Sequence, residues 1–315
     1  MRAMLIVNPF ATSTTDAGRD ALANTLSSRF DLTVEVTTHR GHAGELAARA
    51  RDEQYSAVIV HGGDGTVNEV VNGLLGPPSA PVSDNTALPA IAVVPGGSAN
   101  VFARALGMEA DPLRATGQLV ELLEQSARRR VSLAYTDDRW FLFNAGVGTD
   151  AAVIKSIERQ RNSGKKATPA RYFATTLACF FAAARQHPTV TVTVPGEAPM
   201  QAAYYAFVSN TSPWTYLGSR PVNTNPGTTF DTRLGVFASK SMSVWRNLPL
   251  AAQMLRHGAD PRAGHILRAD DVDSVLIESD QPIDMQMDGE YLGVRTRLEF
   301  GTAPAVLDVV APKTD

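Results

Sequence analysis

Residues 61–75 read HGGDGTVNEVVNGLL and follow the apolar run Ala57–Val60. The run predicts a buried strand, the glycines predict a tight turn, and the apolar residues at helical spacing after Thr66 predict a helix that ends at Gly76. Thr66 and Glu69 have the spacing of a capping box, so we expect this helix to begin where the glycines end. A strand, a glycine turn and a helix N-terminus in this order are typical of a phosphate-binding site.

Asp64 lies inside this glycine turn, where a carboxylate would repel phosphate. Two interpretations are open. Asp64 acts through a divalent cation, an ordered water or a hydroxyl that it deprotonates, or it only caps a tight connection between strand and helix. The first interpretation makes Asp64 a candidate catalytic residue.

Composition limits the class of protein. The chain has 315 residues, a net charge of −3 and a single cysteine, Cys179. The charge predicts no nucleic-acid partner, and one cysteine excludes an internal disulfide and fits a cytoplasmic location. No apolar run is long enough for a membrane span, so we expect any membrane contact to be peripheral.

The first 130 residues alternate short apolar runs with helical patterns, which predicts an α/β domain built on a parallel sheet. The expected strands are residues 4–7, 32–36, 57–60 and 91–94, and the expected helices are residues 16–28, 44–52, 67–75, 99–106 and 112–127. Ligands of such sheets lie beyond the carboxyl ends of the strands. The loops expected at that edge are residues 8–12, 37–39, 61–66 and 95–100.

Residues 131–315 have a different pattern and predict a second, β-rich domain of the sandwich type. The expected strands are residues 131–135, 140–144, 189–194, 202–208, 234–238, 274–278, 283–287 and 296–301. We expect helices at 151–158, 171–186 and 244–257, and a ligand site between the two domains.

Residues 155–171 carry six cations against one acid and precede the aromatic segment 171–186. A solvated loop is one interpretation. The other, which we adopt as a prediction, is a patch that binds anionic lipid in a salt-sensitive way and uses Lys165 and Lys166.

Five motifs in order resemble the diacylglycerol kinase catalytic-domain family of bacterial lipid kinases, which includes relatives that act on sphingosine and ceramide. They are Val7-Asn8-Pro9, Gly62–Glu69, residues 95–104, residues 144–150 and Asp288-Gly289-Glu290. The resemblance implies a nucleotide-binding domain similar to those of phosphofructokinase and NAD kinase, and a lipid-binding β-sandwich. It also implies ATP and Mg²⁺, a neutral lipid acceptor at a membrane surface, phospholipid biosynthesis, and a chain that can form a homodimer.

The resemblance assigns roles to individual residues. Asp64, Asp288 and Glu290 become the candidate catalytic residues, with one of Asp288 and Glu290 as the base that deprotonates the lipid hydroxyl. The nucleotide contacts it implies are Asn8, Pro9, Phe10, Ala11, Thr12, Thr38, Gly62, Gly63, Asp64, Gly65, Thr66, Asn68, Glu69, Gly96, Gly97, Ser98 and Asn100.

Two positions depart from the family pattern. Val101 stands where several members have an aspartate. The turn that holds a structural magnesium in those members corresponds to residues 230–234, which keeps one candidate metal ligand, Asp231, and adds a cation, Arg233.

Three functions are compatible with this sequence. The leading one is transfer of the γ-phosphate of MgATP to a neutral lipid, with diacylglycerol as the favoured acceptor. The second is an NAD-kinase-like enzyme with a soluble acceptor. The third, suggested by Val101 and Arg233, is a lipid-binding regulatory protein with weak catalysis. The chain has no G-x-x-x-x-G-K-[ST] sequence and no H-R-D loop, which argues against P-loop and protein-kinase mechanisms.

Overall fold

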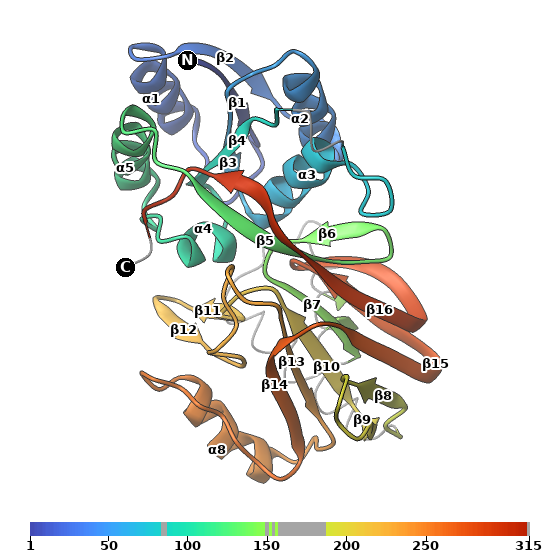
Figure 1. The fold of residues 1–315 in the computed structure, drawn as a ribbon. Coiled ribbons are helices and arrows are strands. Elements are labelled where there is room, and N and C mark those ends of the chain that lie inside the picture. The colour runs from blue at the N-terminus through green and yellow to red at the C-terminus, as the bar shows by residue number, and fades with distance from the viewer. Residues whose placement is uncertain (83–86, 149–150, 153–154, 157–186, 314–315) are drawn as a thin grey trace. The chain divides into compact units, whose positions relative to one another are not determined.

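The computed structural model describes residues 1–82, 87–148, 151–152, 155–156 and 187–313. The chain divides into two compact units (Figure 1). The first contains Met1–Leu133, Asp138–Trp140 and Ala303–Asp315, and the second contains Ala134–Asp137 and Phe141–Thr302. A single boundary near residue 130 did not predict the return of the chain's end to the first unit. That return is made by the long strand β16 (Glu290–Val309), whose Val309 pairs with Ile91.

The first unit is an α/β domain with a parallel sheet in the order β2-β1-β3-β4-β16. Figure 1 shows α1 and α5 together on one side of the strands and α2 and α3 on the other. Its elements are β1 (Arg2–Val7), α1 (Asp16–Ser27), β2 (Asp31–Val36), α2 (His42–Asp52), β3 (Ala57–Gly62), α3 (Asp64–Leu75), β4 (Ala90–Pro95), α4 (Val101–Ala105) and α5 (Pro112–Glu124).

Helices α2 and α3 approach each other closely because both carry a glycine at the contact. A Cβ on Gly73 would lie 2.2 Å from the carbonyl oxygen of Gly44. The inner strands β3 and β4 are buried at every position, which is why their apolar runs were visible in the sequence.

The second unit is β-rich, and its main sheet has the antiparallel order β14-β13-β10-β7-β15-β16. The elements from residue 129 onward are β5 (Arg129–Thr136), β6 (Arg139–Phe141), β7 (Asn144–Gly148), β8 (Val190–Thr193), β9 (Met200–Ala203), β10 (Tyr205–Ser209), β11 (Thr215–Leu217), β12 (Arg220–Val222), β13 (Leu234–Ser239), α8 (Val244–Met254), β14 (Ile266–Val272), β15 (Val275–Met287) and β16.

Side chains alternate between the two faces of β10 and β13. Val208 and Val236 belong to the main core of this unit, whereas Phe207 and Phe237 pack on the other face with Leu250 of α8. The predicted fold class, a parallel α/β domain followed by a β-rich region, is confirmed. The predicted helix at 171–186 and most of the basic segment 155–171 lie outside the described residues.

Candidate functional site

The loops after β1 and β3 meet at the point where the strand order reverses. The chain runs from β1 to β2 on one side and continues with β3 on the other side of β1. Ligands of open α/β sheets bind at such a switch point, beyond the carboxyl ends of the strands. The backbone N–H of Asn8 donates to the carbonyl of His61 at 2.9 Å, and its side-chain amide donates to Thr66 Oγ1 at 2.9 Å.

The loop after β1 lies at the surface. Asn8 Oδ1 accepts from the N–H of Phe10 at 2.9 Å, which turns the chain outward and leaves the ring of Phe10 83% exposed. Pro9 and Ala11 are half-buried and Thr12 is exposed. An exposed ring beside a switch point is available to a flat ligand.

Two pairs of glycines bring the loops after β3 and β4 into backbone contact. A Cβ on Gly97 would lie 2.7 Å from the Cα of Gly63, and a Cβ on Gly96 would lie 3.1 Å from the Cα of Gly62. The N–H of Gly96 also donates to the carbonyl of Gly62 at 2.9 Å. The protein's own packing therefore accounts for Gly97, and it leaves little room for a side chain at Gly62, Gly63 and Gly96.

Gly65 is different. Among the described residues outside its own helix, a Cβ on Gly65 would meet no atom within 4 Å, and its backbone is not in the left-handed region. Neither packing nor conformation explains the glycine, so the open space in front of it, at the start of α3, is where a ligand can approach the backbone.

Thr14 is a residue that the sequence analysis missed. Its Oγ1 is buried without a hydrogen-bond partner among the described residues, and it lies 3.0 Å from the position of a Cβ on Gly96. A buried hydroxyl without a partner is costly, and a ligand beside the glycine loops would satisfy it. The run of hydroxyl residues 12–15 was the signal that could have identified it.

The predicted capping box is wrong. Helix α3 begins at Asp64 with Gly63 as its N-cap, and no side chain caps it. Thr66 Oγ1 instead accepts from Asn8, and Glu69 Oε1 accepts from the N–H of Gly41 at 3.0 Å. The spacing was correct for a box, but tertiary partners compete for both side chains.

Asp64 binds the start of another helix. Its two carboxylate oxygens accept from the N–H groups of Val101 at 3.0 Å and Phe102 at 3.1 Å. Desolvation raises the pKa of Asp64 to about 6, against the opposing effect of these N–H donors. The carboxylate therefore ties α4 and the loop before it to the glycine turn.

Three further predicted nucleotide contacts have structural partners. Asn100, at a φ of 48°, exchanges two hydrogen bonds of 2.8 Å with the backbone of Gly97. Asn68 is buried and donates to the carbonyl of Trp140 at 3.0 Å. Glu69 holds Gly41, as described. These side chains shape the loops, and their direct contact with a nucleotide stays a prediction.

A histidine of the loop after β2, His39, stacks on His42, the first residue of α2. The rings of His39 and His42 lie 4.8 Å apart, and Thr38 Oγ1 is within hydrogen-bond distance of Nδ1 of both. Thr38 and Ser98, both predicted nucleotide contacts, are exposed.

Asp288 is the first residue of a two-residue hairpin turn between β15 and β16, and Glu290 follows the turn as the first residue of β16. Met287 pairs with Glu290, and both Asp288 and Gly289 have positive φ angles of 48° and 80°, the geometry that favours Asp-Gly in a hairpin. The buried carboxylate of Asp288 accepts from the N–H groups of Leu142, Phe143 and Asn144 at 2.7, 3.0 and 3.2 Å. Asp288 thus anchors the hairpin to the segment between β6 and β7, whereas Glu290 is half-buried.

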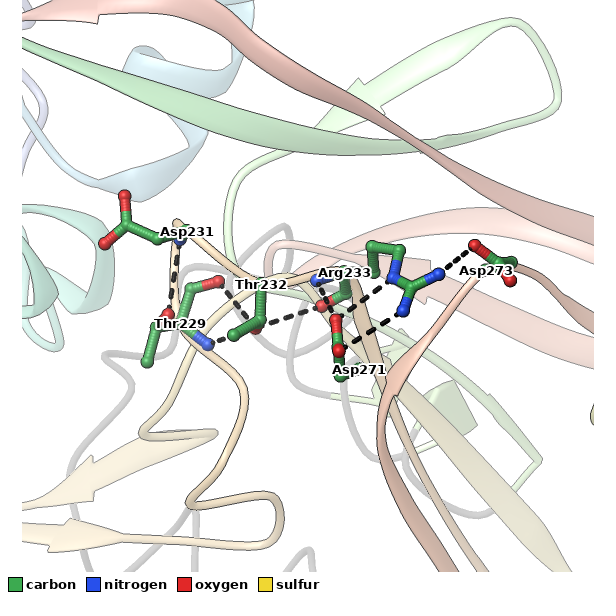
Figure 2. Close-up of polar contacts among 6 residues, drawn as sticks. All are labelled: Thr229, Asp231, Thr232, Arg233, Asp271 and Asp273. Carbon is green, nitrogen blue, oxygen red and sulfur yellow. Dashed lines mark hydrogen bonds and ion pairs between the residues drawn. The ribbon is translucent and has the colours of Figure 1, made fainter.

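The turn around Asp231 does not fit a resident magnesium ion. Arg233 bonds the carboxylates of both Asp271 and Asp273, and Figure 2 shows the carboxylate of Asp231 directed away from this group. These acids raise the pKa of Arg233, so a fixed positive charge occupies the cluster. In the described part of the chain, no three His, Cys, Asp or Glu side chains are grouped to hold a metal ion.

Comparison with known proteins identifies the class of the first unit. Residues 2–133 match the model of the diacylglycerol kinase catalytic domain. The family resemblance inferred from the motifs is therefore confirmed for this part of the chain.

Individual relatives agree with this class. A diacylglycerol kinase of Bacillus subtilis is 33% identical over 152 residues, 47% of this chain and 46% of the relative. A "Probable lipid kinase YegS-like" of Chromohalobacter salexigens is 34% identical over 138 residues, 44% of this chain and 41% of the relative. The chain thus spans about half the length of the curated relatives it matches.

The fold extends over the whole chain. The crystal structure of a putative diacylglycerol kinase from Bacillus anthracis has a TM-score of 0.75 and 22% identity, covering 99% of this chain and 97% of that one.

Among the described residues, no helix is both long and apolar enough to cross a membrane.

Proposed function

We propose that this protein is a lipid kinase that transfers the γ-phosphate of MgATP to the hydroxyl of a neutral lipid, with diacylglycerol as acceptor and phosphatidic acid as product. The observation that carries the proposal is the pair of packed glycine loops after β3 and β4, the first of which lies at the switch point, with one glycine, Gly65, facing open space.

MgATP fits the residues at this place. Gly65 lets phosphate approach the backbone at the start of α3, where the helix dipole favours negative charge. Thr14 offers a hydroxyl that has no partner among the described residues, and the exposed Phe10 offers a ring to the base. Magnesium enters as part of the substrate and neutralises charge on the phosphates.

Asp64 contributes by positioning. Because it joins the glycine turn to the start of α4, it fixes the spacing of the two loops that would surround the phosphates. Phosphoryl transfer depends mainly on such positioning and on charge stabilisation.

Glu290 is the better candidate for the base. Three backbone N–H groups already occupy the oxygens of Asp288, which leaves little room for them to accept a proton from the lipid hydroxyl. The attacking oxygen would lose its proton to Glu290 as it bonds to the γ-phosphorus and ADP leaves.

The cellular setting follows from this activity. The acceptor is a membrane lipid, so the enzyme would be cytoplasmic and would bind the membrane surface transiently, with a homodimer as the expected oligomer. Lys155, the first cation of the predicted basic patch, forms an ion pair with Asp284 at 2.5 Å, and residues 157–171 of that patch lie outside the described residues.

An ATP-consumption screen tests the proposal. The purified chain is assayed with diacylglycerol, monoacylglycerol, sphingosine, ceramide and polyisoprenol in mixed micelles, and without lipid in the presence of NAD. We expect turnover with diacylglycerol. Turnover with NAD alone would make the protein an NAD-kinase-like enzyme, and lipid binding without ATP consumption would make it a regulatory lipid-binding protein.

A further inference from the structure

Helix α8 exposes apolar side chains along its outer face. Trp245 is 84% exposed, Leu248 62% and Val244 41%. Pro249, Ala251 and Ala252 are exposed as well, and Arg246 is the one charged residue of the helix. A surface helix normally places polar residues on this side.

The inner face of α8 is also occupied. Leu250 is buried against Phe207 and Phe237, and Figure 1 shows α8 alongside β13 and β14. The polar side chains of the helix bind the protein itself: Asn247 donates to the carbonyls of Ser241 and Ser243 at 2.8 and 3.0 Å. Gln253 accepts from the N–H of Arg262 at 2.9 Å. The buried face and the polar side chains of α8 are therefore already bound within the protein. Its outer apolar residues are available to contact another surface.

The stretch of sequence that carries this face has charge of one sign. Between Asp231 and Asp260 the chain contains no acidic residue, although the protein as a whole has a net charge of −3. Lys240, Arg246 and Arg256 are exposed in this stretch, at both ends of α8 and beside Trp245. A cationic surface that also presents a tryptophan and a leucine is complementary to an anionic lipid surface.

We propose that the outer face of α8, formed by Val244, Trp245 and Leu248 with Lys240, Arg246 and Arg256, docks the protein onto anionic membranes. Tryptophan is suited to the boundary between headgroups and acyl chains because its ring is apolar and its N–H is polar. The surface deepens the proposed lipid kinase function by naming the face that meets the bilayer. It is tested without ATP or acceptor lipid, so the two proposals can fail separately.

Vesicle sedimentation provides the first test. The protein is mixed with vesicles of equimolar phosphatidylglycerol and phosphatidylcholine, and the bound fraction is measured for the wild type and for Trp245→Ser combined with Leu248→Ser. We expect the double variant to lose roughly tenfold or more in partitioning, since two apolar contacts with the bilayer are removed. Leu113→Ser is the matched control, because Leu113 is 68% exposed but lies on α5. This variant should bind vesicles as the wild type does.

Fluorescence locates the contact. Trp245 is the exposed tryptophan, whereas Trp140 is 2% exposed and Trp214 is half-buried. Vesicles should shift the emission to shorter wavelength, and brominated lipid should quench it. Trp245→Phe should still sediment with vesicles but lose both signals.

Ionic strength tests the charge contribution. Binding should weaken with added salt, and Arg246→Gln combined with Arg256→Gln should remove most of that salt dependence. Equal partitioning of the wild type and the Trp245→Ser/Leu248→Ser variant would overturn the proposal. So would a concentration-dependent dimer that this variant abolishes, since the face would then be an interface between two copies of the chain.

Discussion

Each unit contains an acid beside a glycine turn, and both acids are bound by backbone N–H groups. Asp64 has two such donors at the start of α4, and Asp288 has three in the consecutive residues 142–144, which lead into β7. They differ in their surroundings. Asp64 is followed by Gly65, whose glycine identity the protein's own packing does not explain, whereas the hairpin geometry alone accounts for the sequence Asp288-Gly289.

The difference shows how to separate an acid that serves a ligand site from one that serves the fold. Both were candidate catalytic residues in the sequence, since each stands next to glycine. The donors that hold Asp64 belong to a loop of the candidate site, so moving its carboxylate would alter the site. The donors that hold Asp288 connect strands, so moving its carboxylate would chiefly alter stability.

The largest expected effect is that of Asp64→Asn on turnover. An amide can accept from only one of the two N–H donors, so the loop before α4 would shift relative to the glycine turn. Misplacement of this kind costs roughly 100-fold in turnover. Glu69→Gln is the matched control, because its amide oxygen can still accept from Gly41, and it should retain most of its activity. Wild-type turnover in a folded Asp64→Asn variant would reduce Asp64 to a structural cap.

The second prediction separates Asp288 from Glu290. Asp288→Asn should lower the free energy of unfolding by about 1–3 kcal/mol, because charged hydrogen bonds to three N–H groups are lost. Glu290→Gln should reduce kcat by roughly 100-fold while leaving ATP binding intact. Chemical denaturation and steady-state kinetics measure both. A stable Asp288→Asn variant that has lost kcat, beside an active Glu290→Gln variant, would make Asp288 the base.

The third prediction concerns pH. The pKa of Asp64 is about 6 in the folded protein and 3.8 in the reference state, so the folded protein binds more protons between these values. The stability that Asp64 contributes is therefore present at low pH and falls as pH rises from about 4 to 6. Relative to Asp64→Asn, the wild type should lose about 1–3 kcal/mol across this window and nothing further above it. Denaturation at several pH values measures the difference, and an opposite slope would show that the N–H donors outweigh desolvation.

The fourth prediction compares two glycines of the same site. Gly65→Ala should fold normally, since its Cβ meets no atom within 4 Å, but should raise the KM for ATP by roughly tenfold by blocking approach to the backbone. Gly97→Ala should lower the melting temperature, because its Cβ would lie 2.7 Å from the Cα of Gly63. An unchanged KM for ATP in Gly65→Ala would place the phosphates elsewhere.

Much of the fold was predictable where strands are buried on both faces. The apolar runs of β3 and β4 are uninterrupted, so sequence and structure agree there. β14 was missed because its sequence, ILRADDV, carries charges at three of seven positions, and its pairing with β13 decides its conformation. β16 was predicted as residues 296–301 only, although it spans 20 residues, because its ends are fixed by partners far along the chain.

The site was predictable as a set of loops but not as a set of contacts. The positions of glycines and acids in the sequence located the switch-point loops. The spacing of residues does not reveal the hydrogen-bond partners within these loops. Asn8 bonds Thr66 and Asp64 bonds the start of α4 through tertiary contacts, and Asn100 bonds Gly97 within a local turn.

The smallest expected effect is the change in melting temperature on replacing Arg233. This residue adds a cation to the comparison of the two acids. Arg233 bonds Asp271 and Asp273 beside the turn that keeps Asp231, so a guanidinium supplies the positive charge that a divalent ion would otherwise bring (Figure 2). Both ion pairs of Arg233 are exposed to solvent, and solvent-exposed ion pairs contribute little to stability. The wild type should therefore unfold at the same temperature with EDTA and with Mg²⁺. Arg233→Ala should unfold at a slightly lower temperature and should be stabilised by Mg²⁺ or Ca²⁺, because Asp271 and Asp273 are left without their cation. Lys240→Ala is the control, since it removes a positive charge elsewhere in this unit. A wild-type melting temperature that falls on chelation would show that a resident metal stabilises the protein after all.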